Sequence, residues 1–150
     1  MSRKSTFFAG SFNPFTVGHL SVVERALSLF DRVVIGIGVN AEKGVTPDAE
    51  KQAAMLSHYF RNKPQVEVCV YTGLTADEAK KHKCDCLLRA VRNVTDFEYE
   101  RNLADVNRNI FGMETFILYT EPQYAYVSSS LVRELQRYGM DTSRFLLDYD

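Results

Sequence analysis

The sequence predicts a single α/β domain over residues 1–150, built on a doubly wound, five-stranded parallel sheet. Short apolar runs alternate with amphipathic helical patterns along most of the chain, which is typical of repeated strand–helix–strand units with right-handed crossovers. The run at residues 33–39 is β-branched and free of polar side chains, as expected for a strand covered by helices on both faces. A length of 150 residues fits one domain.

The first strand is expected at residues 6–8, and the first helical pattern has apolar residues at Leu20, Val23, Leu27 and Phe30. The segment between them, residues 9–20, therefore forms a loop that leads into a helix N-terminus. Free backbone N–H groups and the helix dipole suit such a loop to bind phosphate. Gly10 and Gly18 would let a ligand approach closely, and His19 would face the same anion from the first helical turn.

The middle of the chain continues the alternation after the buried strand at 33–39. Thr46, Pro47 and Asp48 form a helix start, and Ala53, Leu56 and Phe60 form the buried stripe of that helix. A third strand follows at residues 66–70, and a short helix capped by Thr75 runs to about residue 83. The fourth strand is expected at residues 86–88 and ends at Arg89.

The C-terminal third contains a long helix from about residue 96 to 110, a fifth strand at 115–119 and a helix capped by residues 128–130. The long helix is expected to bury Tyr99, Leu103, Val106 and Ile110, with Tyr99 in the core. The last helix is expected to bury Leu131, Leu135 and Tyr138. A further short helix is expected within residues 141–150.

Composition excludes several function classes. The formal net charge of -1 predicts no general attraction to nucleic acid or to a membrane surface. No apolar run approaches the roughly 20 residues that span a bilayer, and the N-terminus does not match a signal peptide, so we expect a cytoplasmic protein. The three cysteines are expected to be free thiols, and neither they nor the three separated histidines indicate a metal site.

The polar residues near the predicted carboxyl ends of the strands are mostly cations and hydroxyls. They are Ser11, His19, Lys43, Arg89, Arg92, Ser128, Ser129 and Ser130. Phosphoryl-type transfer needs such groups, because its transition state spreads negative charge over phosphate oxygens. The sequence has no Gly-x-x-x-x-Gly-Lys-Ser/Thr loop, no Gly-x-Gly-x-x-Gly after the first strand and no Gly-x-Ser-x-Gly elbow.

Three motifs follow one another along the chain. Residues 10–19 read Gly-Ser-Phe-Asn-Pro-Phe-Thr-Val-Gly-His and match the pattern G-[ST]-F-[DN]-P-x-[TH]-x-G-H, which is the signature of the nucleotidyltransferase superfamily. Residues 89–100 resemble R-G-[LIV]-R-x-x-x-D-[FY]-E-Y-E, with Ala90 in place of the usual glycine. Residues 126–134 resemble [FY]-[IV]-S-S-[ST]-x-[VIL]-[RK]-E. In this order and spacing, the motifs resemble those of bacterial phosphopantetheine adenylyltransferases.

This resemblance implies a Rossmann-like nucleotidyltransferase that uses ATP and 4'-phosphopantetheine, needs Mg2+ and forms a homohexamer, with coenzyme A as a possible feedback ligand. The catalytic residues would be His19, Ser11, Lys43 and Arg92, and no protein residues are assigned as metal ligands. The acceptor substrate would contact Ser11, Lys43, Leu74, Thr75 and Arg89. ATP would contact Ser11, Phe12, His19, Ala90, Val91, Arg92, Glu100, Tyr124, Ala125, Tyr126, Val127, Ser128, Ser129 and Ser130.

Other interpretations of these residues stay open at this point. Arg89 and Arg92 are also suited to form ion pairs with Asp96 and Glu100. Glu100 could instead belong to the acidic, solvent-exposed face of a helix. The three serines could serve to cap a helix without binding a ligand. The first motif alone also fits a nicotinamide-mononucleotide adenylyltransferase or a glycerol-phosphate cytidylyltransferase. A third hypothesis is a nucleotide-binding regulatory protein without turnover.

Overall fold

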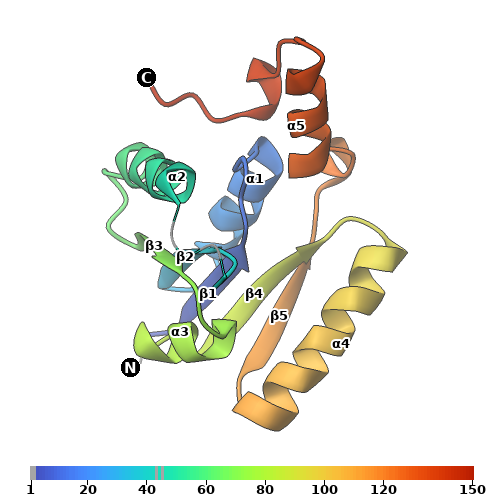
Figure 1. Ribbon diagram of the computed structural model, residues 1–150. Coiled ribbons are helices and arrows are strands. Elements are labelled where there is room, and N and C mark those ends of the chain that lie inside the picture. Colours follow the sequence, from blue (N-terminus) through green and yellow to red (C-terminus); the bar gives the residue numbers. More distant parts are fainter. Residues whose placement is uncertain (1–2, 43, 45) are drawn as a thin grey trace.

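The computed structural model describes residues 3–42, 44 and 46–150, and it contains one parallel sheet of five strands in the order β3-β2-β1-β4-β5 (Figure 1). The strands are β1 (Ser5–Gly10), β2 (Arg32–Gly38), β3 (Val66–Tyr71), β4 (Cys86–Val91) and β5 (Glu114–Tyr119). All neighbours pair in parallel, with Phe7 of β1 opposite Val34 of β2 and Leu87 of β4. The predicted fold class is therefore confirmed.

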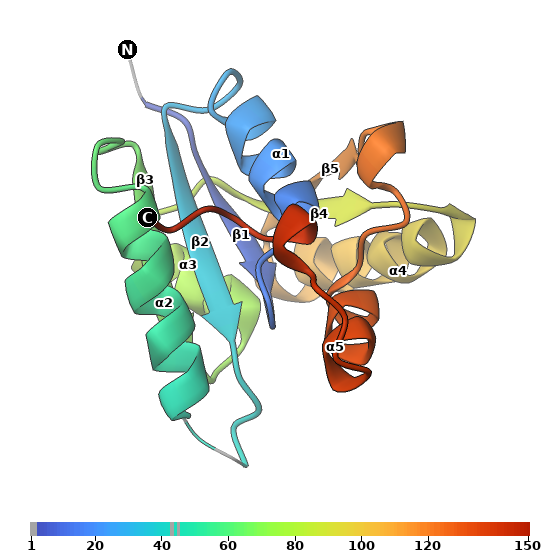
Figure 2. The same ribbon diagram turned by 90° about the horizontal axis from the view of Figure 1, so that it is seen from above.

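Helices cover both faces of the sheet. On one side lie α1 (Val17–Ala26) and α2 (Pro47–Tyr59), and on the other lie α3 (Thr75–Lys81) and α4 (Val94–Phe111) (Figures 1 and 2). Adjacent residues of a strand point to opposite faces, so Phe8 joins the core beneath α1 and α2 while Phe7 joins the core on the α3 side. The last helix, α5 (Ser129–Arg137), follows a 3-10 turn at Pro122–Tyr124.

Two glycines are explained by close packing of aromatic rings. A Cβ on Gly36 would overlap the ring of Phe7, and a Cβ on Gly10 would lie 2.8 Å from ring atoms of Phe12. Both distances are shorter than real Cβ contacts, so any larger residue would push these rings out of the core. Gly10 thus packs against Phe12 and also lines a cavity described below, so its part in ligand approach stays a prediction.

Helix starts follow the predicted chemistry with two corrections. Thr16, Thr46 and Ser128 accept N-cap hydrogen bonds from His19, Ala49 and Leu131, respectively. Asn93 caps α4, which consequently begins two residues before the predicted start. Thr75 does not cap α3: its hydroxyl is 2.8 Å from the Tyr71 hydroxyl, and Leu74 holds the N-cap position without a side-chain bond.

The predicted burial of the long helix was wrong. Tyr99, Leu103, Val106 and Ile110 of α4 are between 36% and 69% exposed, because this stripe does not face the core. Tyr138 of α5 is 74% exposed for the same reason. The tail forms a 3-10 turn at Ser143–Phe145 and then runs extended, with Leu147 buried against the α1 and α2 core, where a continued helix was expected.

Within the described ranges, no helix is both long and apolar enough to cross a membrane.

Candidate active site

A cavity of about 290 Å3 opens at the carboxyl ends of β1 and β4. These two strands are neighbours although three helices and two strands separate them in the chain, so the direction of winding reverses between them. Ligands of doubly wound sheets bind at this reversal. The cavity walls include Ser11 from the first loop, His19 from α1, Arg89 and Arg92 from the β4 end, and Ser129 from α5.

His19 is held in one orientation by the cap of its own helix. Its Nδ1 accepts a hydrogen bond from the Thr16 backbone N–H at 2.9 Å, while its own N–H donates to the Thr16 hydroxyl. The rings of Phe12 and Phe15 pack against the imidazole with centroids 4.9 and 5.2 Å away. Because Nδ1 is an acceptor, the neutral ring carries its proton on Nε2, which is the nitrogen left for a ligand.

The same environment keeps His19 uncharged. Burial, followed by the positive charges of Arg92 and Arg89, lowers the pKa of His19 from 6.5 to about 3. Protonation at Nδ1 would also break the bond from Thr16. The free site therefore offers a neutral N–H donor at this position, beside two permanent cations.

Arg89 makes a bidentate ion pair with Glu100 of α4. Its Nε and Nη2 donate to the two carboxylate oxygens at 2.7 Å each, and its Nη1 donates to the backbone carbonyl of Ala9. Glu100 is only 5% exposed, so it is not part of a solvated acidic face. A guanidinium has five N–H groups, and three are used here, which leaves two for a ligand.

Arg92 also has an acidic partner, because its Nε lies 3.2 Å from the Asp96 carboxylate one helical turn along. Both arginines thus combine the two roles that the sequence left open: each pairs with a carboxylate of α4, and each lines the cavity.

The start of α5 is fastened to the first loop. Ser129 Oγ donates to the Pro14 carbonyl at 2.8 Å, and Arg133 donates to the Asn13 carbonyl. The N-termini of α1 and α5 consequently meet at one cavity, where the backbone N–H groups without intrahelical partners favour an anion. Ser128 therefore caps α5, and all three serines line the first cavity.

A second cavity, of about 380 Å3, lies between the sheet, α3 and α4. Its walls are mainly apolar, with Leu74, Leu103 and Phe111 among them, and its polar groups include Thr75 and Asn107. Ala9 and Arg89 line both cavities, so the two spaces meet at the Arg89 guanidinium. The pair of cavities suits a molecule with an apolar arm and an anionic end that reaches toward bound phosphates.

Comparison with known proteins agrees with the motifs. The family model described as cytidylyltransferase-like matches residues 7–135. Phosphopantetheine adenylyltransferase from Phocaeicola vulgatus is 45% identical over 143 residues, 95% of both chains. The enzyme of that name from Porphyromonas gingivalis is 43% identical over 146 residues, 97% of this chain and 95% of that one. The chain belongs to the phosphopantetheine adenylyltransferase family.

A solved structure supports the fold of this phosphopantetheine adenylyltransferase family member. The bifunctional NMN adenylyltransferase/ADP ribose pyrophosphatase from Francisella tularensis superposes with a TM-score of 0.68 over 99% of the chain. Sequence identity is 16%, and the chain spans 46% of that larger protein. The likeness therefore concerns the nucleotidyltransferase fold.

The structure gathers most residues that the phosphopantetheine adenylyltransferase motifs predicted. The first cavity is lined by Ser11, Phe12, His19, Arg89, Ala90, Arg92, Val127, Ser128, Ser129 and Ser130. The second is lined by Leu74, Thr75, Arg89 and Glu100, so Glu100 lies on the predicted acceptor side and not in the predicted nucleotide cavity. Four residues line neither cavity: Val91, which is buried, and Tyr124, Ala125 and Tyr126. Lys43 lies outside the described residues.

Sequence reasoning missed several residues of the two cavities. Arg133 lines the first cavity, and its position four residues after Ser129 on one helix was the available signal. Tyr99 and Asn107 line the second cavity, although Tyr99 had been assigned to the core. Their signal was the apolar stripe of α4, which was interpreted as packing alone.

We predict that the His19 ring of the free protein stays neutral, with its proton on Nε2, from pH 8 down to pH 5. The unfolded chain takes up this proton near pH 6.5, so the contribution of His19 to stability is complete above that pH and declines as pH falls toward about 3. Long-range 1H–15N NMR reports the tautomer and the charge directly. A transition of this ring near pH 6.5 in the folded protein would contradict the assignment.

Proposed function

We propose that the protein transfers the adenylyl group of ATP to 4'-phosphopantetheine. An oxygen of the acceptor phosphate attacks the α-phosphorus of ATP, the bond to the bridging α–β oxygen breaks, and the products are dephospho-coenzyme A and pyrophosphate. The observation that carries the proposal is the meeting of a phosphate-binding cavity and an apolar cavity at Arg89.

The first cavity supplies what a triphosphate needs. Helix N-termini, the hydroxyls of Ser11 and Ser129, the His19 N–H and the Arg92 guanidinium surround one space. The second cavity offers an apolar wall for the pantetheine arm. Arg89 lines both cavities and keeps two N–H groups without a partner among the described residues, which suits it to bind the phosphate of that arm. Lys43 is proposed as a second cation for that phosphate, as the family motifs imply.

Positioning and charge stabilisation account for catalysis in this proposal. The acceptor phosphate is already ionised at neutral pH and needs no strong base. The nucleophile therefore belongs to the substrate, and no covalent enzyme intermediate is required. Fixed donors such as the Nε2–H of His19 act best on the charge that develops at the α-phosphate, because they need no reorganisation when the reaction occurs.

Mg2+ is proposed as the metal of the reaction, entering with ATP. The described residues of the first cavity include no aspartate or glutamate, so its walls are suited to a cation already bound by phosphate oxygens. Mg2+ commonly binds in this way, with several waters retained. Bound Mg2+ would neutralise phosphate charge. Coenzyme A as a feedback ligand and the cytoplasmic location stay predictions.

Two other functions make different predictions. A nicotinamide-mononucleotide or glycerol-phosphate nucleotidyltransferase would need a cavity for a sugar phosphate, whereas the space next to Arg89 is mainly apolar. A regulatory protein would bind ATP without releasing pyrophosphate, yet His19, Arg89, Arg92 and the three serines line one cavity, as phosphoryl-type transfer needs.

Incubation with ATP, Mg2+ and 4'-phosphopantetheine should give dephospho-coenzyme A in equal amounts with pyrophosphate, as measured by mass spectrometry and a coupled phosphate assay. Nicotinamide mononucleotide and glycerol 3-phosphate serve as parallel acceptors. Turnover with either of these acceptors, and none with 4'-phosphopantetheine, would contradict the proposal and favour another nucleotidyltransferase activity. ATP binding without pyrophosphate release would favour the regulatory alternative.

His19→Ala should lower kcat on the order of 100-fold or more while changing ATP affinity far less, because it removes one fixed donor from the developing charge. Steady-state kinetics and calorimetry with ATP separate the two effects. His58→Ala, on the exposed side of α2, is the matched control and should leave kcat unchanged. Near-normal turnover of folded His19→Ala would remove this residue from the mechanism.

A homohexamer is proposed with the exposed stripe of α4 as one of its contacts. Val106 and Ile110 are 44% and 69% exposed, and an apolar helix face of this kind is typical of an interface between chains. Sedimentation velocity should give a hexamer for the wild type and smaller species for Ile110→Glu, while Asn102→Glu on the same helix should stay hexameric. A monomeric wild type would reject the hexamer, and a hexameric Ile110→Glu would reject this contact.

A further inference from the structure

Three metal-ligating side chains lie together at a distance from both cavities. They are Cys69 on β3, Glu78 on α3 and His82 at the C-terminal end of α3, and one ligand atom of each lies within 4.8 Å of the other two. None of the three lines either cavity described above. The three residues follow no known metal motif and come from different segments of the chain, so spacing does not predict this group.

The spacing is close to that of a metal site. The Glu78 Oε1 and His82 Nε2 atoms are 3.2 Å apart. Ligand atoms about 2.0–2.3 Å from a tetrahedral ion are themselves roughly 3.3–3.6 Å apart. The carboxylate and imidazole therefore already stand at coordination distance, and the Cys69 sulfur lies within 4.8 Å of both.

The surrounding structure holds these side chains in position. Glu78 and His82 are one helical turn apart, the His82 ring packs 6.0 Å from the Phe7 ring, and the His82 carbonyl accepts a bond from Arg32. Cys69 packs against the core on the α3 side from β3, an edge strand of the sheet. All three residues are partly exposed, so an ion and a water ligand can reach them from this edge.

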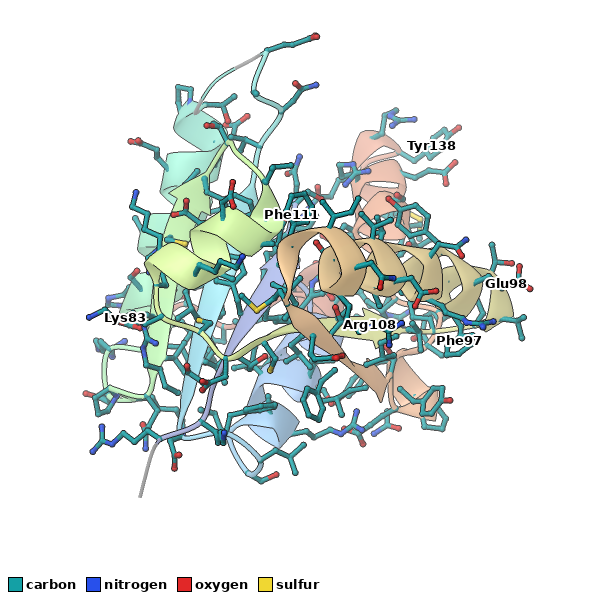
Figure 3. The ribbon with its side chains drawn as sticks, turned by 90° about the horizontal axis from the view of Figure 1, so that it is seen from below. Lys83, Phe97, Glu98, Arg108, Phe111 and Tyr138 are labelled. Carbon is teal, nitrogen blue, oxygen red and sulfur yellow. The ribbon has the colours of Figure 1, made fainter. Side chains whose placement is uncertain are left out.

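We propose that Cys69, Glu78 and His82 bind one Zn2+ ion, with water as the fourth ligand. Thiolate, imidazole and carboxylate are all common zinc ligands, and a thiolate excludes Mg2+ and Ca2+ as the preferred ion. The site would fasten α3 to β3, which are close neighbours in the fold (Figures 1 and 3).

Binding of the ion releases one proton. Burial and the neighbouring Glu78 raise the pKa of the Cys69 thiol to about 12, so without metal the sulfur is protonated at neutral pH. The ion takes the sulfur lone pair and the thiol proton leaves to solvent. One Zn2+ then balances the negative charges of the thiolate and of Glu78, so the occupied site is neutral.

Without an ion, the same residues have a simpler interpretation. His82 and Glu78 would be an ordinary pair one turn apart, and Cys69 would be a small apolar residue in the sheet. The two interpretations differ in whether the Cys69 sulfur coordinates a metal ion.

Co2+ titration of the reduced full chain tests this point, because a cobalt–thiolate bond gives a charge-transfer absorption that carboxylate and imidazole alone do not. We expect one Co2+ per chain with that band, displacement by one equivalent of Zn2+, and a higher Tm with Zn2+ than with EDTA. Cys69→Ser should lose the band, and His82→Ala should weaken binding by at least about tenfold, since even loss of an outer partner costs roughly 10- to 100-fold.

Cys86→Ala and His58→Ala are the matched controls, since each removes a cysteine or a histidine outside the group. Both should bind Co2+ as the wild type does. Absence of the charge-transfer band in the wild type, or its persistence in folded Cys69→Ser, would overturn the proposal. These measurements do not depend on turnover, so they stand whatever the outcome of the adenylyl-transfer assay.

Discussion

The bidentate pair between Arg89 and Glu100 connects the main parts of this structure. It joins the end of β4 to the middle of α4, and the remaining bond to the Ala9 carbonyl ties both to the end of β1. Glu100 is almost completely buried, and both of its carboxylate oxygens accept hydrogen bonds from Arg89. Removing one member of a buried pair costs about 3–5 kcal/mol, an upper bound here because Arg89 is partly exposed. The geometry shared by the two cavities depends on this contact.

At the candidate site, the same groups stabilise the fold and line the first cavity. The cap of α1 fixes the tautomer of His19, and the cap of α5 places its free N–H groups at the same cavity. The fastening bonds from Ser129 and Arg133 to the first loop bring together residues more than a hundred positions apart in the chain. The two helix caps therefore hold the walls of the first cavity in place.

Sequence patterns predicted the sheet and most residues that line the first cavity, because alternation, caps and the motif at residues 10–19 are local signals. They failed where the role of a residue depends on what packs against its helix from elsewhere in the structure. The stripe of α4 has helical spacing whether it faces the core, a ligand or another chain, and Tyr99 was therefore misplaced. The pair between Arg89 and Glu100 was one of the interpretations that the sequence left open, and the structure shows it. The cavity that Glu100 lines could not be predicted, because it depends on how α4 packs against the sheet.

The grouping of Cys69, Glu78 and His82 could not be predicted from spacing either, since it depends on how α3 lies beside β3. As a result, different parts of the seven-residue helix α3 have different neighbours. Leu74 and Thr75 at its start line the apolar cavity, while Glu78 in its middle and His82 directly after it would hold the ion. A helix this short has little intrinsic stability and depends on tertiary contacts for its position. An ion at one end of α3 would therefore act on the cavity wall at the other end by reducing the freedom of the whole helix, without touching the ligand.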